Sequence, residues 1–172
     1  MFSKQLIGLT VASVQSGLPC GKIESLIVSP EKLTVELLCI LDQGGIAYLL
    51  PSDIRFIADD RVIIDAEHKL SEADDLLRHQ EAIKNAFSPI GCSVVTESRK
   101  KLGKVSEYSL DNQSWAAVKL YVSPGLFGNP LQEELMVDRH DVVDVMSNKI
   151  VIRDLHGKAG SRLTIPLPET PR

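Results

Sequence analysis

Cysteine is scarce and unpaired in this sequence. Its three cysteines, Cys20, Cys39 and Cys92, form no Cys-x-x-Cys pair, so neither a disulfide framework nor a zinc site is expected. Cys39 and Cys92 stand in apolar, strand-like stretches, where a free cysteine packs as a small hydrophobic residue. Cys20 stands between Pro19 and Gly21 in a predicted turn. It is therefore the one cysteine that we expect to be exposed.

Long apolar runs and a strong net charge are also missing. The longest apolar runs, such as residues 37–41, are far shorter than the roughly 20 residues that a membrane helix needs. The first residues show no signal-peptide pattern. The net charge is only -4, which predicts no bulk attraction to nucleic acid or to an anionic membrane. We therefore expect a cytoplasmic protein without a transmembrane segment.

Catalytic and cofactor motifs are absent as well. The steps Gly21-Lys22 and Gly103-Lys104 lack the Gly-x-x-x-x-Gly-Lys-Ser/Thr frame of a phosphate-binding loop. No Gly-x-Ser-x-Gly nucleophile turn occurs, and His140 has no second His or Cys at metal-ligand spacing. Paired carboxylates such as Asp59-Asp60 do not follow the spacing of a calcium loop. The sequence predicts no catalytic residue, no metal and no cofactor.

What the sequence does contain is an internal repeat. An alternating stretch opens with Gly21-Lys22 and recurs from Gly103-Lys104, an offset of 82 residues between positions 21 and 103. Asp53–Ile64 aligns without gaps on Asp141–Ile152, an offset of 88 between positions 53 and 141. The growing offset places about six additional residues in the central hairpin of the second copy. A tandem duplication of one small unit explains both alignments.

Each copy reads as a set of short strands separated by Gly, Pro and Asp turns. Between the copies, Ser71–Asn85 has a good N-cap, acidic residues in its first turn and apolar residues at helical spacing, which predicts one amphipathic helix. The predicted fold class is mostly β, with two tandem small barrels joined by one α-helix. The expected divisions are residues 1–67 for the first repeat, 68–87 for a helical linker, 88–156 for the second repeat and 157–172 for a Pro-rich C-terminal tail.

The repeated pattern Gly-x-x-Val, Gly-Lys-Ile/Val, Leu-Pro-x-x-Asp-Ile and Val-Ile-Ile resembles the PRC-barrel family. This small β-barrel occurs in the cytoplasmic part of the photosynthetic reaction-centre H subunit and in the C-terminal domain of a ribosome maturation factor. The second copy departs at Val137-Asp138-Arg139, where the Leu-Pro step is missing. The resemblance implies a docking barrel rather than a catalytic residue. The residues that carry it are Gly8, Val11, Gly21, Lys22, Ile23, Val28, Leu50, Pro51, Asp53, Ile54 and 62–64 in the first copy, and Gly91, Val94, Gly103, Lys104, Val105, Asp141, Val142 and 150–152 in the second.

Two surface features are candidate binding sites. Leu126 and Phe127 stand in the Gly- and Pro-rich insertion, where a turn does not need two large apolar residues. They therefore either fold back onto the barrel or contact a partner. Arg99, Lys100 and Lys101, with Lys104, form a basic cluster on a predicted turn. It is either a solvated hairpin tip or a nucleic-acid contact, although it lacks neighbouring aromatic residues for base stacking.

These patterns favour a non-catalytic adaptor or scaffold that binds a protein partner or self-associates. The predicted contact surface is Leu126-Phe127, helped by the groove between the barrels. The alternative is an RNA- or ribosome-associated assembly factor, with nucleic acid contacted only through ribosome association. A third hypothesis is a small ligand in the inter-barrel cleft, which a deep polar pocket holding His140 would favour. Gly21 and Gly103 are expected to take a positive φ at the end of a hairpin.

Overall fold

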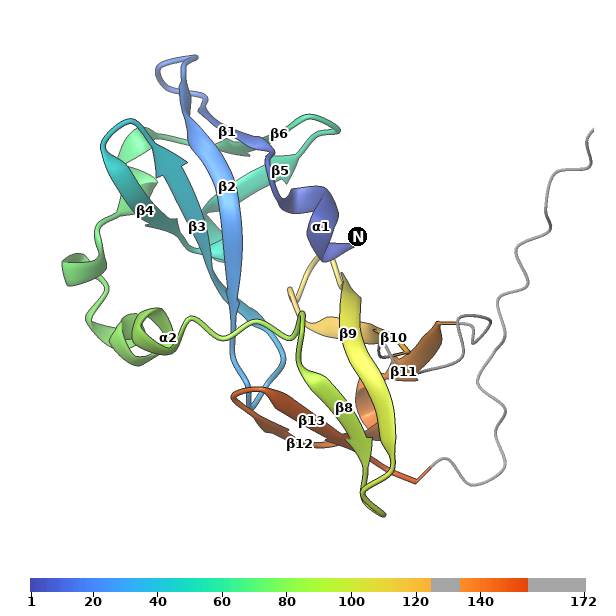
Figure 1. The fold of residues 1–172 in the computed structure, drawn as a ribbon. Coiled ribbons are helices and arrows are strands. Elements are labelled where there is room, and N and C mark those ends of the chain that lie inside the picture. Colours follow the sequence, from blue (N-terminus) through green and yellow to red (C-terminus); the bar gives the residue numbers. More distant parts are fainter. Residues whose placement is uncertain (125–133, 155–172) are drawn as a thin grey trace, which may run out of the picture.

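The computed structural model describes residues 1–124 and 134–154 of the 172-residue chain. The described part is mostly β, in two sheets connected by a segment with short helices (Figure 1). The first half contains α1 (Ser3–Leu6), β1 (Thr10–Ser13), β2 (Pro19–Val28), β3 (Val35–Asp42), β4 (Gly45–Leu49), η1 (Pro51–Asp53), β5 (Ile54–Ile57), β6 (Arg61–Ile64), η2 (Glu67–Lys69) and β7 (Leu70–Ser71). The second half contains β8 (Ser93–Thr96), β9 (Lys101–Leu110), β10 (Ala117–Ser123), β11 (Leu135–Asp138), η5 (Arg139–Asp141), β12 (Val142–Met146) and β13 (Lys149–Ile152).

The two sheets share one strand order. The first runs β5-β6-β1-β2-β3-β4-β7 and the second β12-β13-β8-β9-β10-β11. β1 pairs in parallel with β6, and β8 pairs in parallel with β13, while all other strand pairs are antiparallel. Only β7 has no counterpart among the described residues. The topology therefore repeats as the sequence does.

A glycine at the same place kinks the long strand of each repeat. Gly21 has φ +139° and pairs with Val11, and Gly103 has φ +151° and pairs with Val94, each beside a shift in register. A Cβ at Gly21 would lie 2.7 Å from the Leu41 carbonyl oxygen, and one at Gly103 only 2.1 Å from that of Ser123. The predicted positive φ at both glycines is confirmed, although each lies within its paired strand rather than at the end of the hairpin. The neighbouring strand also leaves no room for a side chain at either position.

The two halves are joined by reciprocal backbone hydrogen bonds. The Val35 amide donates to the Trp115 carbonyl at 2.9 Å, and the Ala117 amide donates to the Leu33 carbonyl at 2.7 Å. The segment before each sheet also crosses to the other half: the Leu110 amide donates to Met1, and the Val28 amide donates to Phe87. Each half therefore supplies backbone partners to the other, reciprocally.

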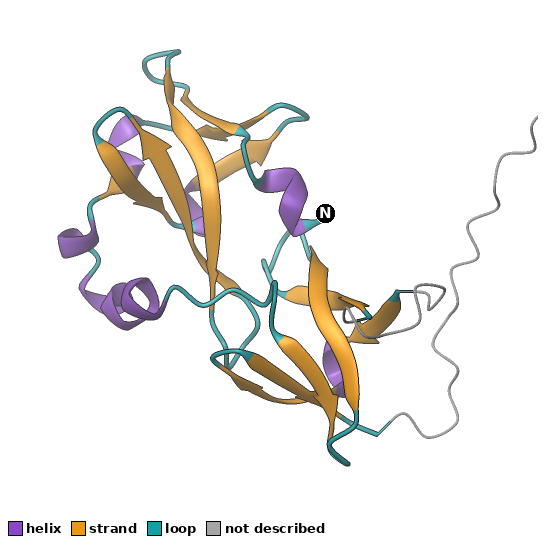
Figure 2. Ribbon diagram, viewed as in Figure 1, coloured by secondary structure: helices purple, strands orange, loops and turns teal. Residues whose placement is uncertain are grey.

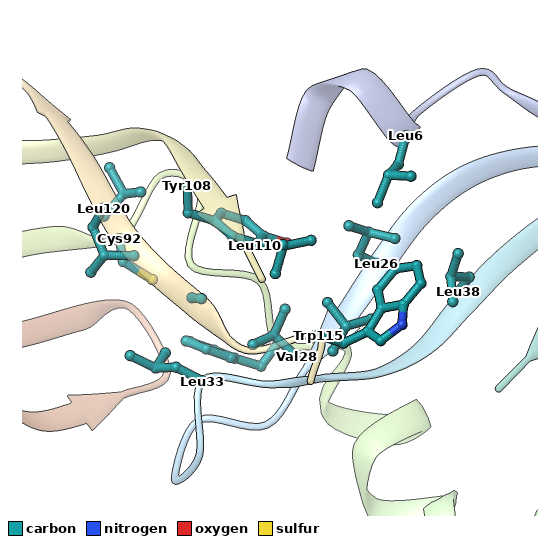
Figure 3. Packing of buried hydrophobic residues seen from close by; sticks show 14 of the residues in the cluster. Leu6, Leu26, Val28, Leu33, Leu38, Cys92, Tyr108, Leu110, Trp115 and Leu120 are labelled. Atoms are coloured by element: carbon teal, nitrogen blue, oxygen red, sulfur yellow. The ribbon is translucent and has the colours of Figure 1, made fainter. Parts of the chain in front are cut away.

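One hydrophobic core extends through both halves (Figure 3). Leu38 and Leu120, at equivalent strand positions, are both 0% exposed, and Tyr108 is 1% exposed. Leu33 and Trp115 lie where the two loops meet. Because domains of this size bury only about 60% of their unfolded surface on their own, the shared core stabilises both repeats.

The predicted single helix over Ser71–Asn85 is wrong. Ser71 pairs with Tyr48 as part of β7, and only η3 (Ala73–Asp75), η4 (Leu77–His79) and the six-residue α2 (Gln80–Asn85) follow (Figure 2). The free edge of β4 provides ladder hydrogen bonds that outweigh the N-cap preference of Ser71. α2 ends at Asn85, and its C-cap residue, Ala86, has a left-handed backbone conformation. Leu76, Ala82 and Ile83 cover a small cluster of Ile27, Leu37 and Cys39 on the first sheet.

The cysteines follow their predicted environments in two cases out of three. Cys39 and Cys92 are buried, as predicted, and burial raises the pKa of both thiols. Cys20 is half-buried rather than exposed, because it packs against the main core next to the Gly21 kink. Burial, followed by the nearby carboxylates of Glu67 and Asp42, raises its pKa too. In residues 1–124 and 134–154, no helix has the length and apolarity to cross a bilayer.

Candidate functional site: a cleft between the repeats

A cleft of about 610 Å³ lies where the first repeat meets the second. One wall comes from α1 and β5, and the other from the loop 111–116 between β9 and β10. Its volume falls in the range of small-molecule and peptide-anchor pockets. Its lining combines apolar and polar side chains: Met1, Gln5, Leu6, Leu9, Pro51, Ile54, Arg55, Phe56, Ile57, Ala58, Asp59, Asn112 and Trp115.

The loop 111–116 is held by hydrogen bonds to Asp111. The Asp111 carboxylate accepts hydrogen bonds from the Gln113 amide (3.1 Å), the Ser114 amide (2.8 Å) and the Ser114 hydroxyl (2.8 Å). The hydrogen bonds from Ser114 and Gln113 lower the pKa of Asp111. Trp115 follows at φ +59° and is only 7% exposed. The turn thus holds the indole in one place at the cleft.

The opposite wall is fixed by contacts between the halves. The Ser3 hydroxyl donates to Glu107, and the Lys4 amide donates to the same carboxylate at 3.2 Å, which attaches α1 to β9. The Met1 nitrogen donates to the Leu110 carbonyl (3.0 Å) and to Asn112 Oδ1 (3.2 Å). The cleft is therefore built by both repeats together and would not exist in either alone.

Phe56 gives the cleft an exposed aromatic rim. Its side chain lines the cleft and remains 53% exposed. Its neighbour Arg55 pairs with Asp65 at 2.9 Å. A large aromatic side chain left accessible beside an apolar floor is typical of a binding surface.

The corresponding place in the second repeat is bridged. η1 begins with Pro51, and η5, its counterpart, begins with Arg139. The Arg139 guanidinium donates through Nη2 to the Lys32 carbonyl, in the loop between β2 and β3. This loop is the counterpart of 111–116. The second repeat therefore joins η5 to the loop 29–34 through its own side chain, whereas in the first repeat Pro51 and the loop 111–116 line an open cleft.

A second, broader cleft of about 1060 Å³ opens near Cys20 and the turn before β2. Carboxylates at Asp42, Asp60, Glu67 and Glu72 line it. The raised pKa of Cys20 keeps its thiol protonated, so this cleft gives no activated nucleophile. His140 lines neither cleft and is exposed on η5.

The basic cluster lies on the tip of the β8–β9 hairpin. Arg99, Lys100 and Lys101 are exposed, with Arg99 at φ +66°. The register also places Lys104 and Lys149 on either side of Ser93, on the same face of the sheet. The sequence did not predict the contribution of Lys149, because no short-range signal reveals that β13 pairs with β8.

The remaining predicted site residues have structural roles or lie elsewhere. Asp53 binds the Lys69 ammonium at 2.8 Å, which raises the pKa of Lys69. The Asp141 carbonyl accepts from the Arg153 amide at 2.8 Å. Lys22 and Lys104 are exposed, and each follows the glycine of its repeat. Leu126 and Phe127 lie outside the described residues.

The sequence predicts a groove between the repeats but assigns none of the lining residues to it: Pro51, Ile54 and Asp59 stand out only for other reasons. Trp115 is the only tryptophan in the chain, and it stands at the position of Leu33 in the first copy. That substitution, together with Pro51 opposite Arg139, was a detectable signal in the alignment of the copies. Phe56 gave no such signal, because its exposure depends on how the halves pack.

The chain matches no model of a known protein family, and no curated protein is significantly similar to it. Among the described residues, no cluster of three or more His, Cys, Asp or Glu side chains could hold a metal ion.

Proposed function

We propose that this protein is a non-catalytic adaptor or scaffold that binds a protein partner in the cleft between its two repeats. The observation that carries the proposal is the contrast between the open cleft, with Phe56 half-exposed, and the place bridged by Arg139 in the second repeat. Surfaces that a chain covers with its own side chain at one site and leaves uncovered at the equivalent one are candidates for a partner.

We further propose that each repeat is a PRC-like barrel. Two features support this: the strand order common to both sheets and the glycine kink followed by an exposed lysine in each copy. An adaptor role agrees with the docking function that the resemblance implies. The free thiols of Cys20, Cys39 and Cys92 agree with the reducing cytoplasm. Leu126-Phe127 remains a predicted second contact.

Affinity capture of the tagged full chain from its native cells tests the adaptor proposal. Phe56→Ser removes the aromatic rim of the cleft, and Met146→Ser is the matched control, because Met146 is 45% exposed on β12 in the second repeat. We expect a stoichiometric protein partner with the wild type and the control, and at least a tenfold loss with Phe56→Ser. Equal recovery with all three proteins would contradict the cleft as contact surface. A Leu126→Ser/Phe127→Ser variant tests the second contact separately.

An RNA- or ribosome-associated assembly factor is the second candidate. The observation that favours it is the lysine face, meaning Lys101, Lys104 and Lys149 on one side of the second sheet next to Arg99 and Lys100. None of these five side chains forms a salt bridge with another described residue. Co-sedimentation with ribosomal particles that weakens steeply between low and moderate salt would support this function. Co-sedimentation that Lys104→Gln/Lys149→Gln does not change would count against it.

A further inference from the structure

We propose that the cleft binds an arginine side chain of the partner, in the place that Arg139 fills in the second repeat. This inference depends on the proposed adaptor function and names the chemistry that the cleft recognises. It follows from the common strand order and the reciprocal contacts of the halves: the second repeat shows the equivalent site with an arginine side chain in place.

The two sites are equivalent at the level of the backbone. η1 and η5 are each a single 3-10 turn that leads directly into the fifth strand of its repeat. The facing loops are closed by the same pattern: Leu33 amide to Ser29 carbonyl at 2.8 Å, and Trp115 amide to Asp111 carbonyl at 3.1 Å. Lys32 precedes Leu33 as Ser114 precedes Trp115. The carbonyl of Ser114 is thus the counterpart of the carbonyl that Arg139 binds.

The first repeat cannot supply the matching donor. Pro51 stands in the place of Arg139, and proline has neither a charged side chain nor a backbone N–H. A guanidinium has five donors in a planar fork and keeps its charge at any physiological pH. A partner arginine would therefore supply from outside the contact that Arg139 makes within the chain.

The surroundings of the open cleft suit a guanidinium. The ring of Phe56, which is 53% exposed, lines the cleft, and arginine stacks on aromatic faces. The indole of Trp115 lines it as well but is only 7% exposed, so it forms part of the floor. Asp59 adds a carboxylate to the lining. Two cationic groups are also present in the cleft: Arg55 pairs with Asp65 at 2.9 Å, whereas the Met1 amine donates to the Leu110 carbonyl and to Asn112 Oδ1, neutral acceptors that leave its charge in place. Residues 1–87 contain 13 Asp and Glu against 8 Lys and Arg, so the field of this half attracts a cationic segment.

The single tryptophan gives a direct test. Three end-blocked tripeptides, Ala-X-Ala with X as arginine, citrulline or norleucine, are titrated into the full-length protein while the fluorescence of Trp115 is recorded. Citrulline keeps the shape of arginine without its charge, and norleucine keeps only the apolar stem. We expect the arginine peptide to bind about tenfold or more tightly than either analogue. Citrulline loses the charge, and norleucine loses both the charge and the planar group that stacks.

Two variants complete the test. Pro51→Arg introduces the internal donor of the second repeat and should abolish binding of the arginine peptide, while Val143→Arg, an exposed position on β12, should leave it unchanged. Circular dichroism confirms that both fold. Binding of the arginine peptide no tighter than citrulline, or undiminished by Pro51→Arg, would overturn the inference. The adaptor proposal is tested separately, and it would be contradicted if Phe56→Ser left capture of the partner unchanged.

Discussion

The two repeats have the same strand order and the same kinked glycine, but they differ where they meet. The first repeat enters its fifth strand through Pro51 and faces Trp115 across an open cleft, whereas the second enters through Arg139 and closes onto Lys32. Positions used identically in both copies hold the fold. Positions at which the copies differ, with an accessible surface in one of them, are where a function specific to this chain is expected.

The largest predicted effect concerns the shared glycines. Gly103→Ala should lower the free energy of unfolding by about 4 kcal/mol, since it combines a disfavoured φ with a clash against the backbone of Ser123. Gly21→Ala should cost about 2 kcal/mol, because its nearest backbone atom is 2.7 Å rather than 2.1 Å away. Urea denaturation of both variants measures the difference. An equal or smaller loss at Gly103 would contradict this account of the kink.

The common core gives the second prediction. Leu38→Ala and Leu120→Ala remove equivalent side chains that are 0% exposed, and each should cost about 3 kcal/mol. Because the core extends through both halves, each variant should unfold in one transition and weaken amide protection in the other repeat as well. Loss of protection confined to the mutated repeat, or two separate transitions, would show that the halves are independent barrels.

A smaller effect distinguishes the loop 111–116 from its counterpart, 29–34, by the pH dependence of stability. The folded-state pKa of Asp111 lies below its usual value of about 3.9, so its contribution to stability is complete above that pH and is lost as the pH falls further. Ser29, its counterpart, does not titrate. Denaturation midpoints between pH 5 and pH 2.5 should therefore fall less for Asp111→Asn than for the wild type. Parallel curves would contradict a role for this carboxylate.

The smallest effect concerns the thiols. Cys20, at the position of Leu102 in the second repeat, is half-buried, and its raised pKa slows reaction with Ellman's reagent at pH 7.5. Cys39 and Cys92 should react only on global unfolding. One slow equivalent in the native protein and two more in urea are expected. Rapid modification of two or three thiols in the native state would show that the halves open independently.

Local signals in the sequence were sufficient for the repeated features. The repeat itself, the positive φ of Gly21 and Gly103, and the burial of Cys39 and Cys92 follow from spacing and residue type alone. The linker could not be predicted in this way, because Ser71 pairs with Tyr48, a contact between distant parts of the chain. The candidate site depends even more on tertiary structure. Pro51, Phe56 and Trp115 are separated in sequence and meet only through the reciprocal joining of the halves.

The most direct test of the account is a nuclear magnetic resonance titration of the ¹⁵N-labelled protein with the Ala-Arg-Ala peptide. Trp115 provides one indole resonance, and β5 and β12 report separately on the two repeats. We predict shifts of the indole and of the amides at 54–59, with residues 142–146 unchanged. Shifts at β12, equal shifts in both repeats, or none at the indole would contradict the claim that the arginine binds in the cleft lined by Pro51, Phe56 and Trp115.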